Sequence, residues 1–589
     1  MRCVVTVIFI YLGAVTCSFD RERSPTVKTE FGEHQGLWTQ TIRGQKVAGY
    51  LGIPYAKPPI GNLRFQKPAP WTRHWRKVRE STQYRPPCMP LEGLERGSED
   101  CLYLNIFTQQ ETQVKNPTKN DEKRAVLVYL ISDSFDHNDN SLYQPSYILD
   151  QDIVLVTLNY RMGIFGYFTT GDEAAPGNYG LKDVLLGLKW LQKNVAAFGG
   201  DPKSVTLMGQ GAGAGVVHLL ALSKKSEGLF HKYITQSGTA LAPWTYRPRE
   251  KAVEMSKFLI SSMKCERNTS KEMVACLRTV PAWMNNYADE IVMNPWDGFG
   301  PIDEPESEEA VITEHPKILM AEGKARDIPW LTGVVADEGF VMTPLLHQNS
   351  SMCQLLAENF EETVFAIANH QLTVTDTPAY LESLSSFYFN GNITNECADG
   401  FVEMAGDVLF NWPVFEALET QVKSMKSKVF FYNFAYNGTF TTTFKFDSSQ
   451  RFGVSHGDDV NYIFPILNEV FDDLQLRNTE DDIAMINVMT EMWGNFVKSG
   501  APSARFLPSW EPYKKARRYM VFGPEAEVSM EKGFLTDRMN FWRKLSEKLV
   551  GELNEETHKG GSSKSADGQI VNQLSVLFVS LAVLLIFRR

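Results

Sequence analysis

The sequence predicts one large α/β domain, and three features of the chain favour that fold class. Two continuous apolar runs, residues 125–131 and 152–160, are typical of strands that are buried on both faces of a sheet. Between the second run and residue 200, apolar residues recur at helical spacing. No internal repeat and no Pro- or Ser-rich linker occurs before about residue 552. Because strands and helices alternate without a break, a single unit is favoured over a string of modules.

The expected elements follow one another along the chain. The runs AVLVYLI (125–131) and DIVLVTLNY (152–160) are the first two buried strands, and further strands are expected at residues 328–335 and 428–436. The stretch VTLMGQGAGAGVVHLLAL (205–222) is predicted to form a strand, a sharp turn and a helix. The helix before it is indicated by apolar residues on one face, namely Leu181, Val184, Leu185, Leu188, Leu191 and Val195.

The turn within residues 205–222 matches a known catalytic motif except at its centre. Its sequence, Gly209-Gln210-Gly211-Ala212-Gly213, follows the G-x-S-x-G nucleophile elbow, but Gly211 stands where a serine would attack. An elbow holds its central residue in a strained backbone conformation, which costs about 1–3 kcal/mol when that residue carries a side chain. Glycine tolerates a positive φ. The substitution is therefore expected to keep the turn and to remove the nucleophile.

Length and composition limit the classes of function. The chain has 589 residues, of which 43% are hydrophobic, so it can bury a large core. Its formal net charge is −11 and its basic residues are scattered, so the sequence shows no basic patch of the kind that binds nucleic acid. We predict no nucleic-acid partner, no metal site and no cofactor.

Both ends of the chain have the pattern of targeting segments. Residues 1–17 are predicted to be a secretory signal peptide, because Met1-Arg2 precedes a short apolar run. One domain is expected over residues 18–552, followed by a polar linker at 553–569 and a hydrophobic segment at 570–589. That last segment is either a short membrane span or the cleaved signal for a GPI anchor. Small residues at 560–563 favour the anchor, so we expect an extracellular protein attached to the plasma membrane.

Cysteine usage agrees with export. Six cysteines remain outside the signal region, an even number that suits an oxidising compartment. The close pairs Cys88/Cys101 and Cys265/Cys276 would each close a loop that contributes about 3 kcal/mol. Pairing of Cys353 with Cys397 then follows by elimination. Four N-x-[ST] sequons are candidate glycosylation sites on the surface: Asn268, Asn349, Asn392 and Asn437.

Several long stretches match the pattern of one family. They are GIPYAKPPIGNLRFQKPAPW (52–71), SEDCLYLNIF (98–107), NYRMGIFGYF (159–168), PGNYGLKDVLLGLKWLQKNVAAFGGDP (176–202) and QSG (236–238). With them the chain resembles the type-B carboxylesterase/cholinesterase family from roughly residue 25 to residue 549. The resemblance implies the α/β-hydrolase fold: a single large domain with a mostly parallel central sheet and a deep pocket above the strand ends. It also implies the disulfides Cys88–Cys101 and Cys265–Cys276.

Two details are similar to one branch of that family, the insect juvenile hormone esterases. Gln210 before the nucleophile position resembles their GQSAG motif, and the residues around His456 resemble their G-x-x-H-x-x-D motif. The cholinesterase branch agrees less well. Its choline site needs a tryptophan for cation–π attraction, and the loop between Cys88 and Cys101 has none.

The family's catalytic triad runs Ser…Glu…His, and two of its three positions are filled here. By motif, Glu338 matches the acid and His456 matches the base. In a working triad the carboxylate orients the imidazole and stabilises its charged form. Because Gly211 has no hydroxyl proton to give, we interpret Glu338 and His456 as a buried hydrogen-bonded pair that has kept a structural role and lost its catalytic one.

The oxyanion hole is the second predicted loss. The resemblance implies H-G-G-G-F after the strand at 125–131, where this chain has Ile131-Ser132-Asp133-Ser134-Phe135. Ser132 and Asp133 replace the two hole glycines, and Ala212 stands at the position of the remaining donor. Loss of one donor costs about 10²–10³ in rate. Loss of a triad serine costs on the order of 10⁶. Either loss argues against ordinary ester hydrolysis.

Three functions compete on this pattern. We favour a catalytically inactive, carboxylesterase-like binding or adhesion protein at the cell surface, because neuroligins resemble the chain in having glycine at the elbow. The second is a non-hydrolysing carrier of an apolar ester ligand, such as a hormone or an odorant. The third is a residual ester hydrolase with a relocated nucleophile. Ser132, Ser134 and Ser237 are the candidates, and we interpret all three as surface or supporting hydroxyls. The expected partner is thus an extracellular protein or an apolar ester, and a homodimer stays open.

Overall fold

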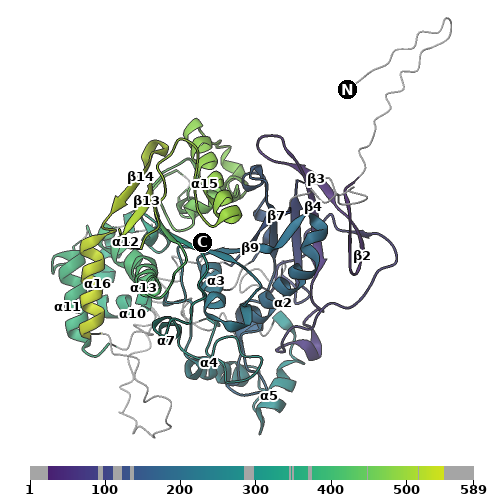
Figure 1. The fold of residues 1–589 in the computed structure, drawn as a ribbon. Coiled ribbons are helices and arrows are strands. Elements are labelled where there is room, and N and C mark those ends of the chain that lie inside the picture. The colour runs from purple at the N-terminus through teal and green to yellow at the C-terminus, as the bar shows by residue number, and fades with distance from the viewer. Residues whose placement is uncertain are drawn as a thin grey trace, which may run out of the picture.

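The computed structural model describes residues 24–549 except 90–96, 110–122, 133–134, 136–137, 284–297, 344–345, 348–349, 369–373, 395, 448 and 515. The predicted signal peptide, polar linker and C-terminal hydrophobic segment lie outside the described residues. A large sheet runs through the molecule with helices on both sides (Figure 1). No helix within the described ranges is long and apolar enough to cross a membrane.

The large sheet is parallel at its centre and antiparallel at its edges. Its eleven strands follow the order β14-β13-β12-β11-β10-β9-β7-β8-β6-β4-β3. Neighbours are parallel from β13 through to β8, whereas β14, β6, β4 and β3 pair antiparallel. This arrangement confirms the mostly parallel sheet of the α/β-hydrolase fold. The strands are β3 (Leu37–Gln40), β4 (Lys46–Pro54), β6 (Tyr103–Thr108), β7 (Arg124–Leu130), β8 (Val154–Leu158), β9 (Gly200–Gln210), β10 (Lys232–Gln236), β11 (Trp330–Val335), β12 (Val429–Phe434), β13 (Arg518–Phe522) and β14 (Val528–Lys532).

The central strands are buried on both faces, as the apolar runs predict. Along β7, Val126 and Val128 pack into one core and Leu127 and Tyr129 pack into another, because successive side chains point to opposite faces of a sheet. Helices α2 (Tyr179–Asn194) and α3 (Ala212–Leu222) belong to the first core. Helix α15 (Glu480–Ser499) covers the other face. The sheet is thus the middle layer of three.

The remaining elements surround this layer. A small second sheet, of order β1-β2-β5, is formed by β1 (Thr26–Thr29), β2 (Gly32–Gln35) and β5 (Arg79–Glu80). The other helices are α1 (Gly163–Tyr167), α4 (Arg249–Ser262), α5 (Ser270–Leu277), α7 (Pro316–Ala321), α9 (Ser350–Glu358), α10 (Phe360–Ala368), α11 (Thr377–Phe389), α12 (Ala398–Gly406), α13 (Trp412–Gln421), α14 (Ile466–Val470) and α16 (Thr536–Leu549).

The ends of α15 show how local sequence sets the helix boundaries. The Thr479 side chain accepts from the Asp482 amide, and the Asp482 carboxylate accepts from the Thr479 amide in return, which forms a capping box. At the other end, Gly500 takes the left-handed conformation, with φ of 77°, that commonly terminates a helix.

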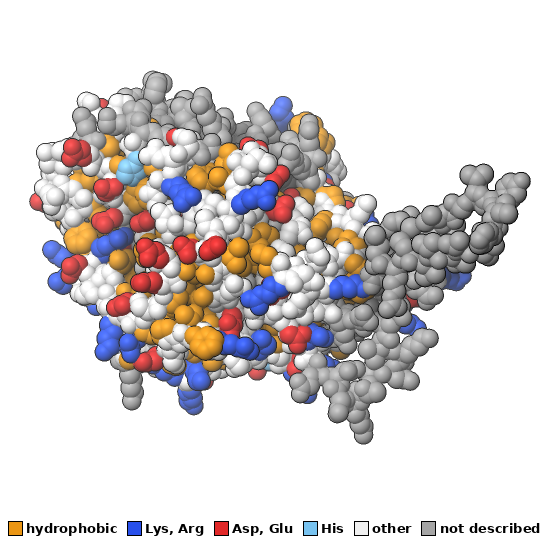
Figure 2. Space-filling model, turned by 90° about the horizontal axis from the view of Figure 1, so that it is seen from above, with side chains coloured by type: hydrophobic (Ala, Val, Ile, Leu, Met, Phe, Trp, Pro, Cys, Tyr) orange, Lys and Arg blue, Asp and Glu red, His pale blue; other side chains and the backbone are white. Residues whose placement is uncertain are grey.

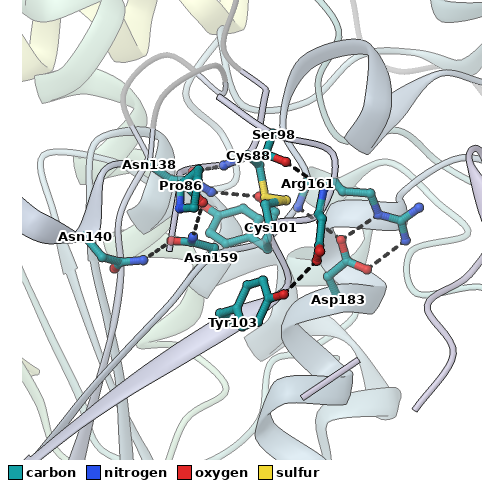
Figure 3. Close-up of a disulfide and its surroundings, with 12 residues drawn as sticks. Pro86, Cys88, Ser98, Cys101, Tyr103, Asn138, Asn140, Asn159, Arg161 and Asp183 are labelled. Atoms are coloured by element: carbon teal, nitrogen blue, oxygen red, sulfur yellow. Dashed lines mark hydrogen bonds and ion pairs between the residues drawn. A yellow bond between two sulfur atoms is a disulfide. The ribbon is translucent and has the colours of Figure 1, made fainter. Parts of the chain in front are cut away.

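Three disulfides join the cysteine pairs named from the sequence: Cys88–Cys101, Cys265–Cys276 and Cys353–Cys397. The first lies beside a buried ion pair (Figure 3). In that pair Arg161 Nε and Nη2 each donate to one carboxylate oxygen of Asp183, at 2.7 Å. Both side chains are almost wholly inaccessible to solvent, at 3% and 0% exposure. The pair therefore ties the chain just before α1 to α2 within the core.

Charges of both signs are mixed on the molecular surface. Figure 2 shows a face on which Lys and Arg side chains alternate with Asp and Glu around a band of apolar side chains. Neither sign forms a continuous field on this face. The view agrees with the scattered charges of the sequence.

Candidate functional site

The predicted elbow is present at the junction of β9 and α3. Gly211 lies between them with φ of 54° and ψ of −124°, a conformation that favours glycine. Its amide donates to the Gln236 carbonyl at 2.9 Å. The flanking glycine of the motif is also required, because a Cβ at Gly213 would stand 2.3 Å from the Leu130 carbonyl oxygen. The chain therefore has the backbone of a nucleophile elbow without the serine side chain of the G-x-S-x-G motif.

Glu338 and His456 form the hydrogen-bonded pair that the motifs predict. Glu338 follows β11, is fully buried, and accepts through Oε2 from His456 Nδ1 at 2.6 Å. Its second oxygen accepts from the Val335 amide at 3.0 Å. Because an ionised carboxylate can only accept, Nδ1 is the donor of this hydrogen bond. The ring packs against Phe410, with centroids 4.3 Å apart.

The position of Gly211 relative to this base is that of a nucleophile. A Cβ built on Gly211 would stand 3.0 Å from His456 Nε2. That contact is tighter than most real Cβ atoms make, so a side chain at residue 211 would meet the imidazole that accepts a proton in a working triad, and the imidazole would have to shift. The elbow, the imidazole and the carboxylate are therefore neighbours, and residue 211 brings no hydroxyl to them.

Sequence reasoning missed the group that now contacts the base. Gln210 Nε2 lies 2.8 Å from His456 Nε2, which its amide N–H can donate to. In the sequence Gln210 served only as a mark of one branch of the family. Its position directly before Gly211 was the only signal in the sequence that Gln210 lies near the base. A motif does not show the direction in which the Gln210 side chain points. The acceptor nitrogen of the base is therefore engaged by an amide.

Two buried aspartates hold the loop that carries His456. Asp459 accepts from the Tyr432 hydroxyl at 2.6 Å and from Gln236 Nε2 at 2.7 Å, and burial raises its pKa to about 6. Asp458 accepts from the amides of Thr442 and Ser455 at 2.8 and 2.9 Å, and burial raises its pKa to about 7. These contacts fix the loop against β10 and β12, so the imidazole is positioned by the core.

The predicted oxyanion loop is described only in part. Ser132 is buried, and its hydroxyl faces the buried hydroxyl of Tyr160. Within the described residues neither group makes a hydrogen bond of normal geometry. Ala212 is the first residue of α3 and is buried. Asp133 and Ser134 lie outside the described residues.

Neither described serine candidate is hydrogen-bonded to the base. Ser237 follows β10 with φ of 50° and is fully buried. Its hydroxyl, like that of Ser132, has no hydrogen-bond partner among the described residues. The contacts of His456 go instead to Glu338 and Gln210.

The other predicted site residues concern modification and metals. Asn268, Asn392 and Asn437 are exposed, so their side chains are accessible to glycosylation, and Asn349 lies outside the described residues. Among the described residues, no group of three or more His, Cys, Asp or Glu side chains could hold a metal ion.

Comparison with known proteins shows the family of the chain. Residues 23–542 match the carboxylesterase family. A carboxylic ester hydrolase of Bombus ignitus is 31% identical over 92% of this chain and 97% of its own length. A juvenile hormone esterase of Tribolium castaneum is 30% identical over 89% of this chain and 94% of its own length. Neuroligin-2 of Homo sapiens is 28% identical over 90% of this chain and 68% of its own length. The chain, with its glycine-centred elbow, belongs to the carboxylesterase family.

Proposed function

We propose that this protein is a non-hydrolysing member of the carboxylesterase family that binds an extracellular partner at the cell surface. One observation carries the proposal: a glycine occupies the elbow centre that faces His456, and the Gln210 amide contacts the base. Serine-dependent ester hydrolysis needs a hydroxyl at that point. Loss of a triad serine costs on the order of 10⁶ in rate. Binding of a protein partner requires only a folded surface, and the intact sheet and elbow indicate that the chain folds without the serine.

A second candidate is a carrier that holds an apolar ester without turnover. It is favoured by the retained Glu338–His456 pair and by the relatives named as juvenile hormone esterases. A carrier would gain stability from its ligand, because a molecule that binds only the native state raises the melting temperature. Melting-temperature shifts with a panel of apolar esters separate the two candidates: a saturable shift favours the carrier, and a flat response favours the protein-binding function.

Hydrolysis of p-nitrophenyl acetate tests the shared premise of both candidates. We expect the purified protein to hydrolyse it no faster than Gly211→Ala and His456→Phe, because no hydroxyl is available for the base to activate. Melting of each variant checks folding, since Ala at a φ of 54° is strained. A burst of p-nitrophenol from the natural protein that is absent in both variants would overturn the proposal.

The proposal places the protein outside the cell, held by the hydrophobic segment at residues 570–589. We expect phosphatidylinositol-specific phospholipase C to release it from intact cells, because small residues at 560–563 suit an anchor attachment site. Immunoblotting of the medium measures the release. If the enzyme releases nothing while truncation before Leu574 makes the protein soluble, the segment is a membrane span instead.

A further inference from the structure

A tract of positive charge lies in the N-terminal part of an otherwise acidic protein. Between Glu33 and Glu80 the sequence contains no Asp or Glu, while Lys and Arg occur throughout that interval. Over the whole chain the balance is reversed, with 59 Lys and Arg against 70 Asp and Glu. The tract is densest at residues 71–80, WTRHWRKVRE. The expectation of scattered basic residues therefore holds for most of the chain but not for this tract.

The densest part of the tract is held in place by Trp75. The Trp75 amide donates to the Phe31 carbonyl at 3.0 Å, and the indole Nε1 donates to the Glu33 carbonyl at 3.0 Å. The Trp75 ring also meets the His34 ring edge to face, with centroids 4.8 Å apart. These contacts fix the segment against the small sheet β1-β2-β5, whose strand β5 follows it in the chain.

Three cations on either side of this tryptophan face solvent without a partner. Arg73, Arg76 and Lys77 are exposed. Within the part of the chain that the structure describes, no hydrogen bond or ion pair engages any of the three side chains. The carboxylates that flank the tract in sequence, Glu33 and Glu80, are exposed as well. An external anion can therefore meet these cations without breaking an existing ion pair.

Two further arginines extend the positive charge beyond β5. Arg79 Nη2 donates to the Gly52 carbonyl at 3.5 Å, and a Cβ at Gly52 would stand 3.1 Å from Arg85 Nε, so both side chains lie against the same residue. Burial lowers the pKa of Arg79, and the positive charge of Arg85 lowers it further, while Asp100 opposes the change. Two like charges are thus held near each other, and a bound anion would relieve their repulsion.

We propose that Arg73, Arg76, Lys77, Arg79 and Arg85 form a basic surface that binds a sulfated polysaccharide outside the cell. A linear polyanion carries sulfate groups at repeated intervals, which suits cations spread along one exposed segment. Because the formal net charge of the protein is −11, a polyanion is attracted only where cations are locally in excess. The guanidinium fork donates parallel N–H groups to two oxygens of a tetrahedral anion.

An anionic membrane suits the basic surface less well. Segments that lie on a bilayer place exposed apolar side chains beside their cations. Here both indoles are turned to the backbone, since Trp71 Nε1 donates to the Arg73 carbonyl at 2.7 Å and Trp75 Nε1 donates to the Glu33 carbonyl. The location outside the cell rests on the proposed function, whereas the absence of ester hydrolysis plays no part in this inference.

Fluorescence anisotropy with a labelled heparin dodecasaccharide tests the basic surface, using the full chain at about 0.15 M ionic strength. We expect saturable binding, and we expect fully desulfated heparin to compete at least tenfold more weakly than heparin. The triple variant Arg73→Gln/Arg76→Gln/Lys77→Gln should weaken binding at least tenfold, because each cation lost from contact with an anionic surface costs a factor of roughly five.

The matched control is Arg543→Gln/Lys544→Gln/Lys548→Gln, which removes three positive charges from exposed positions of α16. It should bind heparin within twofold of the natural protein, and melting curves check that both triple variants fold. No saturable binding, equal losses in the two triple variants, or equal competition by desulfated heparin would overturn the inference.

Vesicles that contain phosphatidylserine are the second probe. We expect the protein to bind them more weakly than heparin. Tighter binding to the vesicles would assign the basic surface to a membrane and would also overturn the inference. Hydrolysis of p-nitrophenyl acetate is measured independently of these titrations, so failure of heparin binding and failure of the proposed function are distinguishable.

Discussion

Gly211→Ser will not by itself turn this protein into an esterase. The new side chain will meet His456, because a Cβ at residue 211 stands 3.0 Å from Nε2, a contact so tight that the imidazole must shift. It must displace the Gln210 amide, and the strained turn will lower stability by roughly 1–3 kcal/mol. By sequence, the loop at 131–134 still lacks the hole glycines. We therefore expect a rate against short-chain p-nitrophenyl esters close to that of Gly211→Ala, which has the same Cβ and no hydroxyl.

Rebuilding the oxyanion loop in the same protein should change that result. Addition of Ile131→His, Ser132→Gly and Asp133→Gly to Gly211→Ser should raise the rate above that of the single variant by about 10²-fold or more. The gain is expected because backbone donors would again face the developing oxyanion. Melting curves must show that all variants fold. If Gly211→Ser alone reached the rate of an ordinary carboxylesterase, our interpretation of the loop would be wrong.

Arg161→Met will destabilise the fold by about 3–5 kcal/mol, because it leaves the wholly buried carboxylate of Asp183 without its partner. The pair lies beside the Cys88–Cys101 disulfide (Figure 3), so the loss occurs in the core and not at the surface. Equilibrium unfolding in urea under oxidising conditions measures the free energy of unfolding.

Lys67→Met is the control for this prediction, because Lys67 pairs with Glu309 at 2.8 Å while both side chains are 60% exposed. An exposed pair contributes about 0–1 kcal/mol. The double variant Arg161→Met/Asp183→Leu should recover part of the loss, since the unpaired charge is then gone. A loss below about 1 kcal/mol for Arg161→Met would show that water or a neighbouring group compensates Asp183.

The fold was predictable because its signals are local. The runs at 125–131 and 152–160 became β7 and β8, and the helical period around Leu188 became α2. The motif at 209–213 specified the elbow, since a Cβ at Gly209 or Gly213 would stand 2.4 or 2.3 Å from backbone atoms. Many other elements were not predicted from periodicity, among them the small sheet β1-β2-β5 and the helices α9 to α12. Their faces are set by contacts between distant segments, which no local pattern records.

The site was predictable only as far as its motifs reach. Glu338 and His456 were named from short patterns, and the structure joins them at 2.6 Å. The contact of Gln210 with His456 depends on how the end of β9 meets a loop 246 residues later, which is a property of packing. Asp459 stood in the G-x-x-H-x-x-D motif, but its role and that of Asp458 in holding the loop were not predicted, because a sequence does not show which carboxylates are buried.

Labelling with a fluorophosphonate probe tests most directly whether this protein has an activated nucleophile. The probe reacts with serines whose hydroxyl is activated by a neighbouring base, so it reports nucleophiles wherever they lie. The natural protein and Gly211→Ala should both remain unlabelled, with an active carboxylesterase as the positive control and mass spectrometry to locate any adduct. Stoichiometric labelling of the natural protein at Ser132, Ser134 or Ser237 would contradict the account. It would show that an activated serine elsewhere in the chain takes the place of the serine missing at position 211.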